Sequence, residues 1–264
     1  MSKIGMGLGS QQIADLAALT CQTDALELED FLNPAEFDRL EPRLAEARAA
    51  LRDYPGELLL SGPYIDLNPA SPDALVQEAC RQRFRQALDW AKQLGAREII
   101  FCSTFIPIIY LEFYEADWAR RSADFWSAFL DEVPGGVTIS LCNTFEFDPR
   151  WLVWVAGQVN RPNFRLALDL GHFLVYARIG LEDWLRQTAP FLSTVYVHSN
   201  HGQVDEHLPP GEGLLSAEQV QMAARYAPAQ ARFVLKPFEK TALPASLAWL
   251  RRVLEAKSST MGGV

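Results

Sequence analysis

Side chains that commonly bind metal ions are concentrated in one part of this chain. All four histidines lie there: His172, His198, His201 and His207. Asp205 is separated from His207 by one residue, and alternate side chains of an extended segment point the same way. We therefore expect Asp205 and His207 to bind one ion together, with His172 as a third ligand. Three protein ligands and an open fourth position are typical of catalytic zinc.

The elements that position these residues alternate between strand and helix eight times. Apolar strand patterns cover 3–8, 25–29, 58–60, 98–102, 137–142, 166–168, 195–198 and 233–235. Helical patterns cover 10–19, 34–51, 71–95, 116–132, 149–159, 181–187, 216–226 and 244–255. Short apolar strands joined by helices favour parallel pairing with both faces covered. The pattern predicts an α/β fold, a (β/α)₈ TIM barrel.

A doubly wound open sheet is the competing architecture, but no Gly-x-Gly-x-x-Gly follows a strand. A length of 264 residues suits a barrel formed as a single domain. We expect one barrel over residues 1–264, with a frayed tail at 257–264. Ser10, Asn33 and Ser71 are the expected caps of the first three helices.

Active sites of such barrels lie at the carboxyl ends of the strands. The predicted strand ends place Asp169, His198 and Lys236 there as candidate catalytic residues. We expect four further residues near the same ends to bind substrate: Glu27, Tyr64, Asn143 and Glu212. The cavity should therefore open at this face and contain the three metal-binding candidates as well.

Composition narrows the choice of partners. The formal net charge is −9, whereas nucleic-acid binders usually show a basic excess, so no nucleic acid is expected. The amino terminus lacks the apolar segment of a signal peptide, and no apolar run approaches the ~18 residues of a membrane span. The four cysteines form no Cys-x-x-Cys pair. We expect a cytoplasmic protein with free thiols and no membrane partner.

Three segments resemble the xylose isomerase-like barrel superfamily: Leu168-Asp169-Leu170-Gly171-His172, Val197-His198-Ser199-Asn200, and the run from Asp205 to Gly213. That group contains sugar isomerases and epimerases, inosose dehydratase-like enzymes and zinc-dependent apurinic-site endonucleases. The strand rhythm extends the resemblance over nearly the whole chain. The most distinctive part is Asp-x-His followed by Gly-Glu-Gly.

The epimerase branch implies one divalent metal held by a Glu, an Asp, a His and a second Glu after strands five to eight. By position, the Asp is Asp169 and the His is His198, but Cys142 and Lys236 stand where the two Glu residues belong. In the endonuclease branch, three ligands of one zinc match His172, Asp205 and His207. Ser61 and Cys102 replace other ligands of that cluster, which argues against DNA repair by its mechanism.

Lys236 has several interpretations. Its ammonium could replace the metal beside Asp169, or a lowered pKa could make it a base or Schiff-base nucleophile. It could instead form a structural ion pair with Asp169 in a barrel that has lost its chemistry. We expect its amine within direct or water-bridged reach of Asp169. If the register of strand eight is shifted, Glu239 becomes the lost ligand. Independently of that register, Glu146 could reach back and replace the Glu ligand that is missing at Cys142.

The resemblance implies an isomerase, an epimerase or a related lyase. It would abstract a proton next to the carbonyl of a small carbohydrate, helped by Lys236 or by one divalent metal, zinc or manganese; a site without metal is the other option. A pseudoenzyme or binding protein is the alternative, and an endonuclease-like phosphodiesterase the third. A homo-oligomer is compatible with the aromatic stretch 105–118, which could also be a lid or ordinary helix packing.

Overall fold

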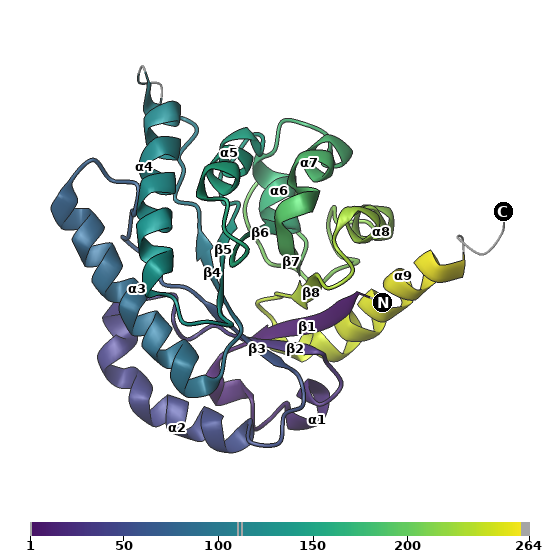
Figure 1. Ribbon diagram of the computed structural model, residues 1–264. Helices are drawn as coiled ribbons and strands as arrows, with labels where there is room; N and C mark the ends of the chain where they lie inside the picture. Colours follow the sequence, from purple (N-terminus) through teal and green to yellow (C-terminus); the bar gives the residue numbers. More distant parts are fainter. Residues whose placement is uncertain (1, 110, 112, 260–264) are drawn as a thin grey trace.

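The computed structural model describes residues 2–109, 111 and 113–259. Its centre is a closed barrel of parallel strands in the order β1 to β8 (Figure 1). The strands are β1 (Lys3–Leu8), β2 (Ala25–Leu28), β3 (Glu57–Ser61), β4 (Glu98–Cys102), β5 (Thr138–Cys142), β6 (Phe164–Asp169), β7 (Leu192–Val197) and β8 (Arg232–Leu235). The predicted (β/α)₈ TIM barrel is confirmed.

Helices pack around the outside of the barrel (Figure 1). They are α1 (Ala17–Thr20), α2 (Leu40–Ala50), α3 (Ala74–Leu94), α4 (Tyr114–Phe129), α5 (Arg150–Val159), α6 (Leu170–Tyr176), α7 (Leu181–Thr188), α8 (Ala217–Tyr226) and α9 (Leu243–Ser259). Short 3₁₀ turns cover Ser10–Gln12, Pro34–Arg39, Leu130–Glu132, Ala189–Phe191 and Lys240–Ala242. Among the described residues, no helix has both the length and the apolar character needed to cross a bilayer.

The helix starts differ in detail from the sequence prediction. Asn33 caps as expected, since its side chain accepts from the Ala35 N–H. Helix α3 is capped by Asp73, because Ser71 instead accepts a hydrogen bond from the Asp73 N–H. The helix expected over 10–19 is divided into a 3₁₀ turn and the short α1. Helix α9 continues to Ser259, and the rest of the expected frayed tail lies outside the described residues.

Most rings of the aromatic stretch 105–118 pack as core. Phe105 and Trp118 are buried and lie 4.9 Å apart between ring centroids. Tyr114 stacks on Phe105, whereas Phe113 is exposed. Tyr110 lies outside the described residues. For the buried rings, ordinary helix packing describes the contacts.

An apolar layer divides the barrel interior into two ends. It consists of inward-facing side chains from seven of the strands: Ala25, Leu59, Ile100, Cys142, Ala167, Tyr196 and Val234. Below it, at the amino ends of the strands, Arg232 lies 2.6 Å from both Glu98 and Glu57. Ser140 and Ser193 also donate to Glu98. This network fills the amino end of the barrel with paired charges.

Removing one member of the network should leave a buried charge with fewer partners. We expect Glu98→Ala to lower the free energy of unfolding by about 3 kcal/mol. The matched control is Glu182→Ala, which removes one partner of Arg186 from an exposed 2.8 Å pair; its effect on stability should be much smaller, because exposed pairs contribute little. Urea unfolding compares the two, and equal losses would contradict a structural role for this network.

Candidate functional site

A cavity of about 340 Å³ opens among the loops that follow the carboxyl ends of the strands. Five of the residues predicted to meet there line it: Asp169, His172, Asp205, His207 and Lys236. His198 is fully buried, and its Nε2 lies 2.8 Å from Asp169 Oδ1. The predicted position of the pocket at the carboxyl face is therefore correct, with His198 placed behind its wall.

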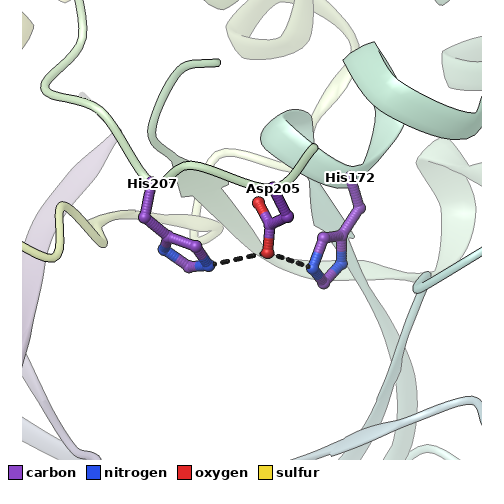
Figure 2. A group of neighbouring side chains, drawn as sticks. All are labelled: His172, Asp205 and His207. Atoms are coloured by element: carbon purple, nitrogen blue, oxygen red, sulfur yellow. Dashed lines mark hydrogen bonds and ion pairs between the residues drawn. The ribbon is translucent and has the colours of Figure 1, made fainter. Parts of the chain in front are cut away.

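Two histidines converge on one carboxylate oxygen in this cavity. Asp205 Oδ2 lies 3.1 Å from His172 Nε2 and 3.0 Å from His207 Nε2 (Figure 2). Each residue offers a ligand atom, and these three atoms all lie within 4.8 Å of one another. This is the trio that the sequence predicts as metal ligands. Among the described residues, no other group of three or more His, Cys, Asp or Glu residues meets that distance criterion.

The other nitrogen of each ring fixes its orientation. His172 Nδ1 lies 2.8 Å from the Asn143 carbonyl oxygen, and His207 Nδ1 lies 2.6 Å from the Lys236 carbonyl oxygen. Carbonyl oxygens only accept, so each Nδ1 carries the proton and a neutral ring presents the lone pair of Nε2 to Asp205. A lone pair and a carboxylate repel unless a proton or a metal ion lies between them. Backbone carbonyls orient metal-binding histidines in the same way.

The pKa shifts of His172 and Asp205 show that positive charge stabilises this trio. Burial opposes ionisation of His172, but Asp169 and Asp205 outweigh burial and raise its pKa to about 9. Burial likewise opposes ionisation of Asp205, yet the two imidazoles hold the pKa of its carboxyl well below the usual range. Two nitrogens and one oxygen are donors that Zn²⁺ accepts. The residues present therefore fit a divalent metal ion.

The loop that carries Asp205 and His207 is not extended, contrary to the sequence argument. His207 has φ of 50°, a conformation that side chains other than glycine rarely adopt. Ser199 and Leu208 hold the loop closed through a pair of 2.8 Å backbone hydrogen bonds. Gly213 is required for packing, because a Cβ there would lie 2.5 Å from the Asn200 carbonyl oxygen. The Gly-Glu-Gly motif thus shapes the loop.

Asp169 and His198 form a second layer beneath the trio. Asp169 caps α6, because its Oδ1 accepts from the His172 N–H at 2.9 Å, and the same oxygen accepts from His198 Nε2 at 2.8 Å. Gly171 makes room for this contact, since a Cβ there would lie 1.9 Å from the His198 ring. The His198 ring stacks on that of His207, with centroids 3.7 Å apart. Burial lowers the pKa of His198, so its ring is neutral at pH 7.

Lys236 forms no direct ion pair with Asp169, so of the two arrangements expected for its amine, direct or water-bridged, the direct one is wrong. Its ammonium lies 2.8 Å from Glu29 and 3.1 Å from Glu27. Strand β1 lies between β8 and β2, and Gly7 in β1 allows the lysine to cross. A Cβ at Gly7 would lie 2.3 Å from Glu29 Oε1 and 2.7 Å from Lys236 Cδ. The glycine therefore permits the ion pair across the barrel interior.

The same contacts exclude the lowered pKa considered for Lys236. Burial lowers the pKa of the amine, but Glu27 and Glu29 outweigh burial and raise the pKa above its ordinary value. At neutral pH Lys236 is a fixed ammonium ion and not a free amine. Tyr196 donates a 2.8 Å hydrogen bond to Glu27, and Lys240 lies 3.0 Å from Glu29. The two carboxylates thus have two lysines to balance them.

The alternative ligands do not reach the cavity wall. Glu239 is exposed and bonds to Thr241, so the predicted register of strand eight is correct. Glu146 is buried and accepts from the Thr144 N–H at 2.6 Å, but it does not line the cavity. Burial raises the pKa of Glu146.

The predicted substrate-binding residues have different positions. Tyr64 lines the cavity. Asn143 is buried, and its side chain bonds to the backbone of Asp169 on both the N–H and the carbonyl. Glu27 is fully buried below the wall, and Glu212 is exposed outside it. The aromatic residues Phe145, Tyr176 and Phe238 also line the cavity and were not predicted; Phe238 follows directly after Lys236-Pro237.

The geometry defines a (β/α)₈ barrel with a histidine and carboxylate site at the carboxyl ends of its strands. The chain belongs to the xylose isomerase-like TIM barrel family, whose sequence model matches residues 16–253. An uncharacterised protein of Methanocaldococcus jannaschii is 25% identical over 190 residues, which is 69% of this chain and 64% of that protein. The chain thus spans less than two thirds of that relative's length.

Three solved structures share the fold. A D-tagatose 3-epimerase-like protein has a TM-score of 0.78 at 19% identity, covering 98% of this chain and 100% of that one. A D-psicose 3-epimerase crystallised in the presence of D-fructose has a TM-score of 0.75 at 18% identity, covering 96% of this chain and 99% of that one. A Thermus thermophilus protein soaked with ZnCl₂ has a TM-score of 0.76 at 22% identity, covering 96% of this chain and 98% of that one. These neighbours are similar in fold, and two of them are described as sugar epimerases or epimerase-like.

The ion pairs of Glu29 predict a dependence of stability on pH. Burial favours the neutral acid, but Lys236 and Lys240 outweigh burial and lower the pKa of Glu29 from 4.5 to about 2. A carboxyl whose folded-state pKa is depressed stabilises the fold above its unfolded pKa and loses that contribution as the pH falls through the folded pKa.

We expect Glu29→Gln to destabilise the protein by about 2 kcal/mol at pH 7, because both lysines then lose a partner. The difference from wild type should stay constant down to pH about 5 and shrink between pH about 4.5 and 2. Urea unfolding across that range measures it, with the exposed Glu212→Gln as control. A difference that is the same at pH 3 as at pH 7 would contradict the ion-pair account.

Proposed function

We propose that this protein is a metal-assisted isomerase or epimerase that acts on a small carbohydrate with a carbonyl group. The observation that carries the proposal is the convergence of two histidine Nε2 atoms on Asp205 Oδ2, with both Nδ1 atoms held by backbone carbonyls. Family membership and the epimerase folds support the reaction class.

The balance of charges supports one divalent ion. Lys236 and Lys240 offset Glu27 and Glu29. Within the described part of the chain, Asp169 and Asp205 then have only histidines as ion-pair partners, and one divalent cation supplies the matching charge. The metal belongs at the trio and not at the epimerase position, because Cys142 and Lys236 stand where two carboxylates would be needed. Two buried atoms of this region have no hydrogen-bond partner among the described residues: Asp205 Oδ1 in the trio and His198 Nδ1 beside it. They lie 3.8 Å apart.

A bound Zn²⁺ or Mn²⁺ would polarise the substrate carbonyl as a Lewis acid. Asp169 lines the cavity beside the trio, and we assign it the role of proton acceptor, with its pKa held well below the ordinary range by the histidines, which outweigh burial. His198 acts through Asp169 by fixing one of its oxygens. The charge of Lys236 is balanced by Glu27 and Glu29, so its role at the site is to orient His207 through its backbone carbonyl. Tyr64 lies in the wall where it can contact the sugar.

Metal content tests the site directly. After dialysis against zinc, we expect about one zinc ion per chain, and His207→Ala should lose most of it. His201→Ala is the matched control, because His201 is exposed and its ion-pair partner among the described residues is Glu206, outside the trio. Elemental analysis by mass spectrometry gives the stoichiometry. Zinc that survives His207→Ala but is lost in Asp169→Asn would place the ion at Asp169 and His198 instead.

The reaction class is tested separately with a panel of ketoses and aldoses in ²H₂O. The zinc-loaded protein should incorporate deuterium at the carbon next to the carbonyl of at least one sugar, and removal of zinc should abolish the exchange. NMR of the recovered sugars detects it. Stoichiometric zinc binding without exchange in any sugar would favour a binding protein that retains the barrel and has lost catalysis.

A further inference from the structure

Positive charge in the cavity is already committed to carboxylates. The cationic or ionisable nitrogen groups that line it, among the described residues, are those of His172, His207 and Lys236. The two histidines face Asp205, and Lys236 faces Glu27 and Glu29. A phosphate or carboxylate on a ligand would need an unpaired cation to offset the loss of its hydration. The cavity therefore disfavours anionic ligands.

Aromatic rings from four separate segments line this cavity. Tyr64, Phe145, Tyr176 and Phe238, which we call the aromatic wall, all line it. They come from separate segments, after β3, after β5, at the end of α6 and after β8, so their meeting does not follow from sequence adjacency. Three of them are exposed, with Phe238 at 67%, Phe145 at 39% and Tyr64 at 38%. Phe145 and Tyr176 meet edge to face, 5.1 Å apart.

The aromatic wall begins beside the trio. The ring of Phe238 stacks on His207, with centroids 4.1 Å apart and planes 15° apart. A ligand that reaches the trio with a polar oxygen therefore has an exposed aromatic surface next to it. The cavity volume of about 340 Å³ is near the lower end of the roughly 300–1,000 Å³ range of ligand pockets, which limits the ligand to a small molecule.

We infer that the cavity takes an uncharged carbohydrate that carries both a carbonyl group and an aromatic or apolar substituent, such as an aryl glycoside with a ketone on its sugar ring. Its polar end lies at the trio and its substituent packs against the aromatic wall. The assignment rests on the proposed function for the position of the polar end. The reasons for it are the committed cations, which exclude a phosphate group, and the exposed rings, which gain from covering by an apolar group.

The probes are phenyl β-D-glucopyranoside, methyl β-D-glucopyranoside and glucose 6-phosphate, titrated calorimetrically into the zinc-loaded full chain. The phenyl group buries more apolar surface than the methyl group and adds an aromatic contact. Together these two effects correspond to a preference of about tenfold for the phenyl glycoside. We expect phenyl to bind about tenfold more tightly than methyl, and glucose 6-phosphate to bind more weakly than either. Equal affinity for the two glycosides, tighter binding of the phosphate, or no measurable binding of the phenyl glycoside would each overturn the inference.

Variants locate the preference. Phe145→Ala and Tyr64→Ala remove wall residues outside the proposed metal trio, and each should reduce the phenyl preference about threefold. Trp154→Ala is the matched control, because Trp154 is an exposed ring on α5 that does not line the cavity. A phenyl preference that survives both wall variants would overturn the assignment.

Zinc content, measured on the same samples, separates this inference from the proposed function. A phenyl preference in a protein that binds no zinc would retain the aromatic wall as the binding surface and reject the metal site. Stoichiometric zinc binding without a phenyl preference would retain the metal site and reject the aromatic wall as the binding surface.

Discussion

The ammonium group of Lys236, held between Glu27 and Glu29, is the interaction on which the rest of the cavity depends. It is buried, so its charge requires partners within the barrel. Two carboxylates from β2 and the residue following it supply them, and Gly7 leaves the space that the contact needs. The backbone carbonyl of the same lysine receives the Nδ1–H of His207. One residue thus occupies a position where the resemblance implies a metal ligand and also orients a histidine of the trio.

This arrangement separates the cavity into two regions of different charge. On one side, two lysines and two glutamates balance each other. On the other, Asp169 and Asp205 share three histidines, and a hydrogen bond orients each of the three rings. Metal ions bind where negative charge and oriented lone pairs coincide. The trio meets both conditions, whereas Lys236 places a cation where the epimerase pattern needs a carboxylate.

Sequence patterns predicted the barrel because its period is local: short apolar strands, capped helices and polar residues at strand ends recur in order. The trio was also predictable, since Asp205 and His207 lie close in sequence and His172 follows a strand end. The partners of Lys236 were not predicted, because the crossing from β8 to β2 depends on a missing side chain at Gly7. The orientation of His207 depends on a positive φ that its sequence neighbours do not signal. The aromatic wall combines single residues from three loops and the end of α6, and no spacing connects them.

The most direct test of the central claim is a crystal structure of the zinc-soaked protein, with anomalous scattering measured on both sides of the zinc absorption edge. The account predicts one strong anomalous peak bonded to His172 Nε2, His207 Nε2 and a carboxylate oxygen of Asp205, with Lys236 still paired to Glu27 and Glu29. A peak bonded to Asp169 and His198, with Lys236 displaced from its two glutamates, would contradict it.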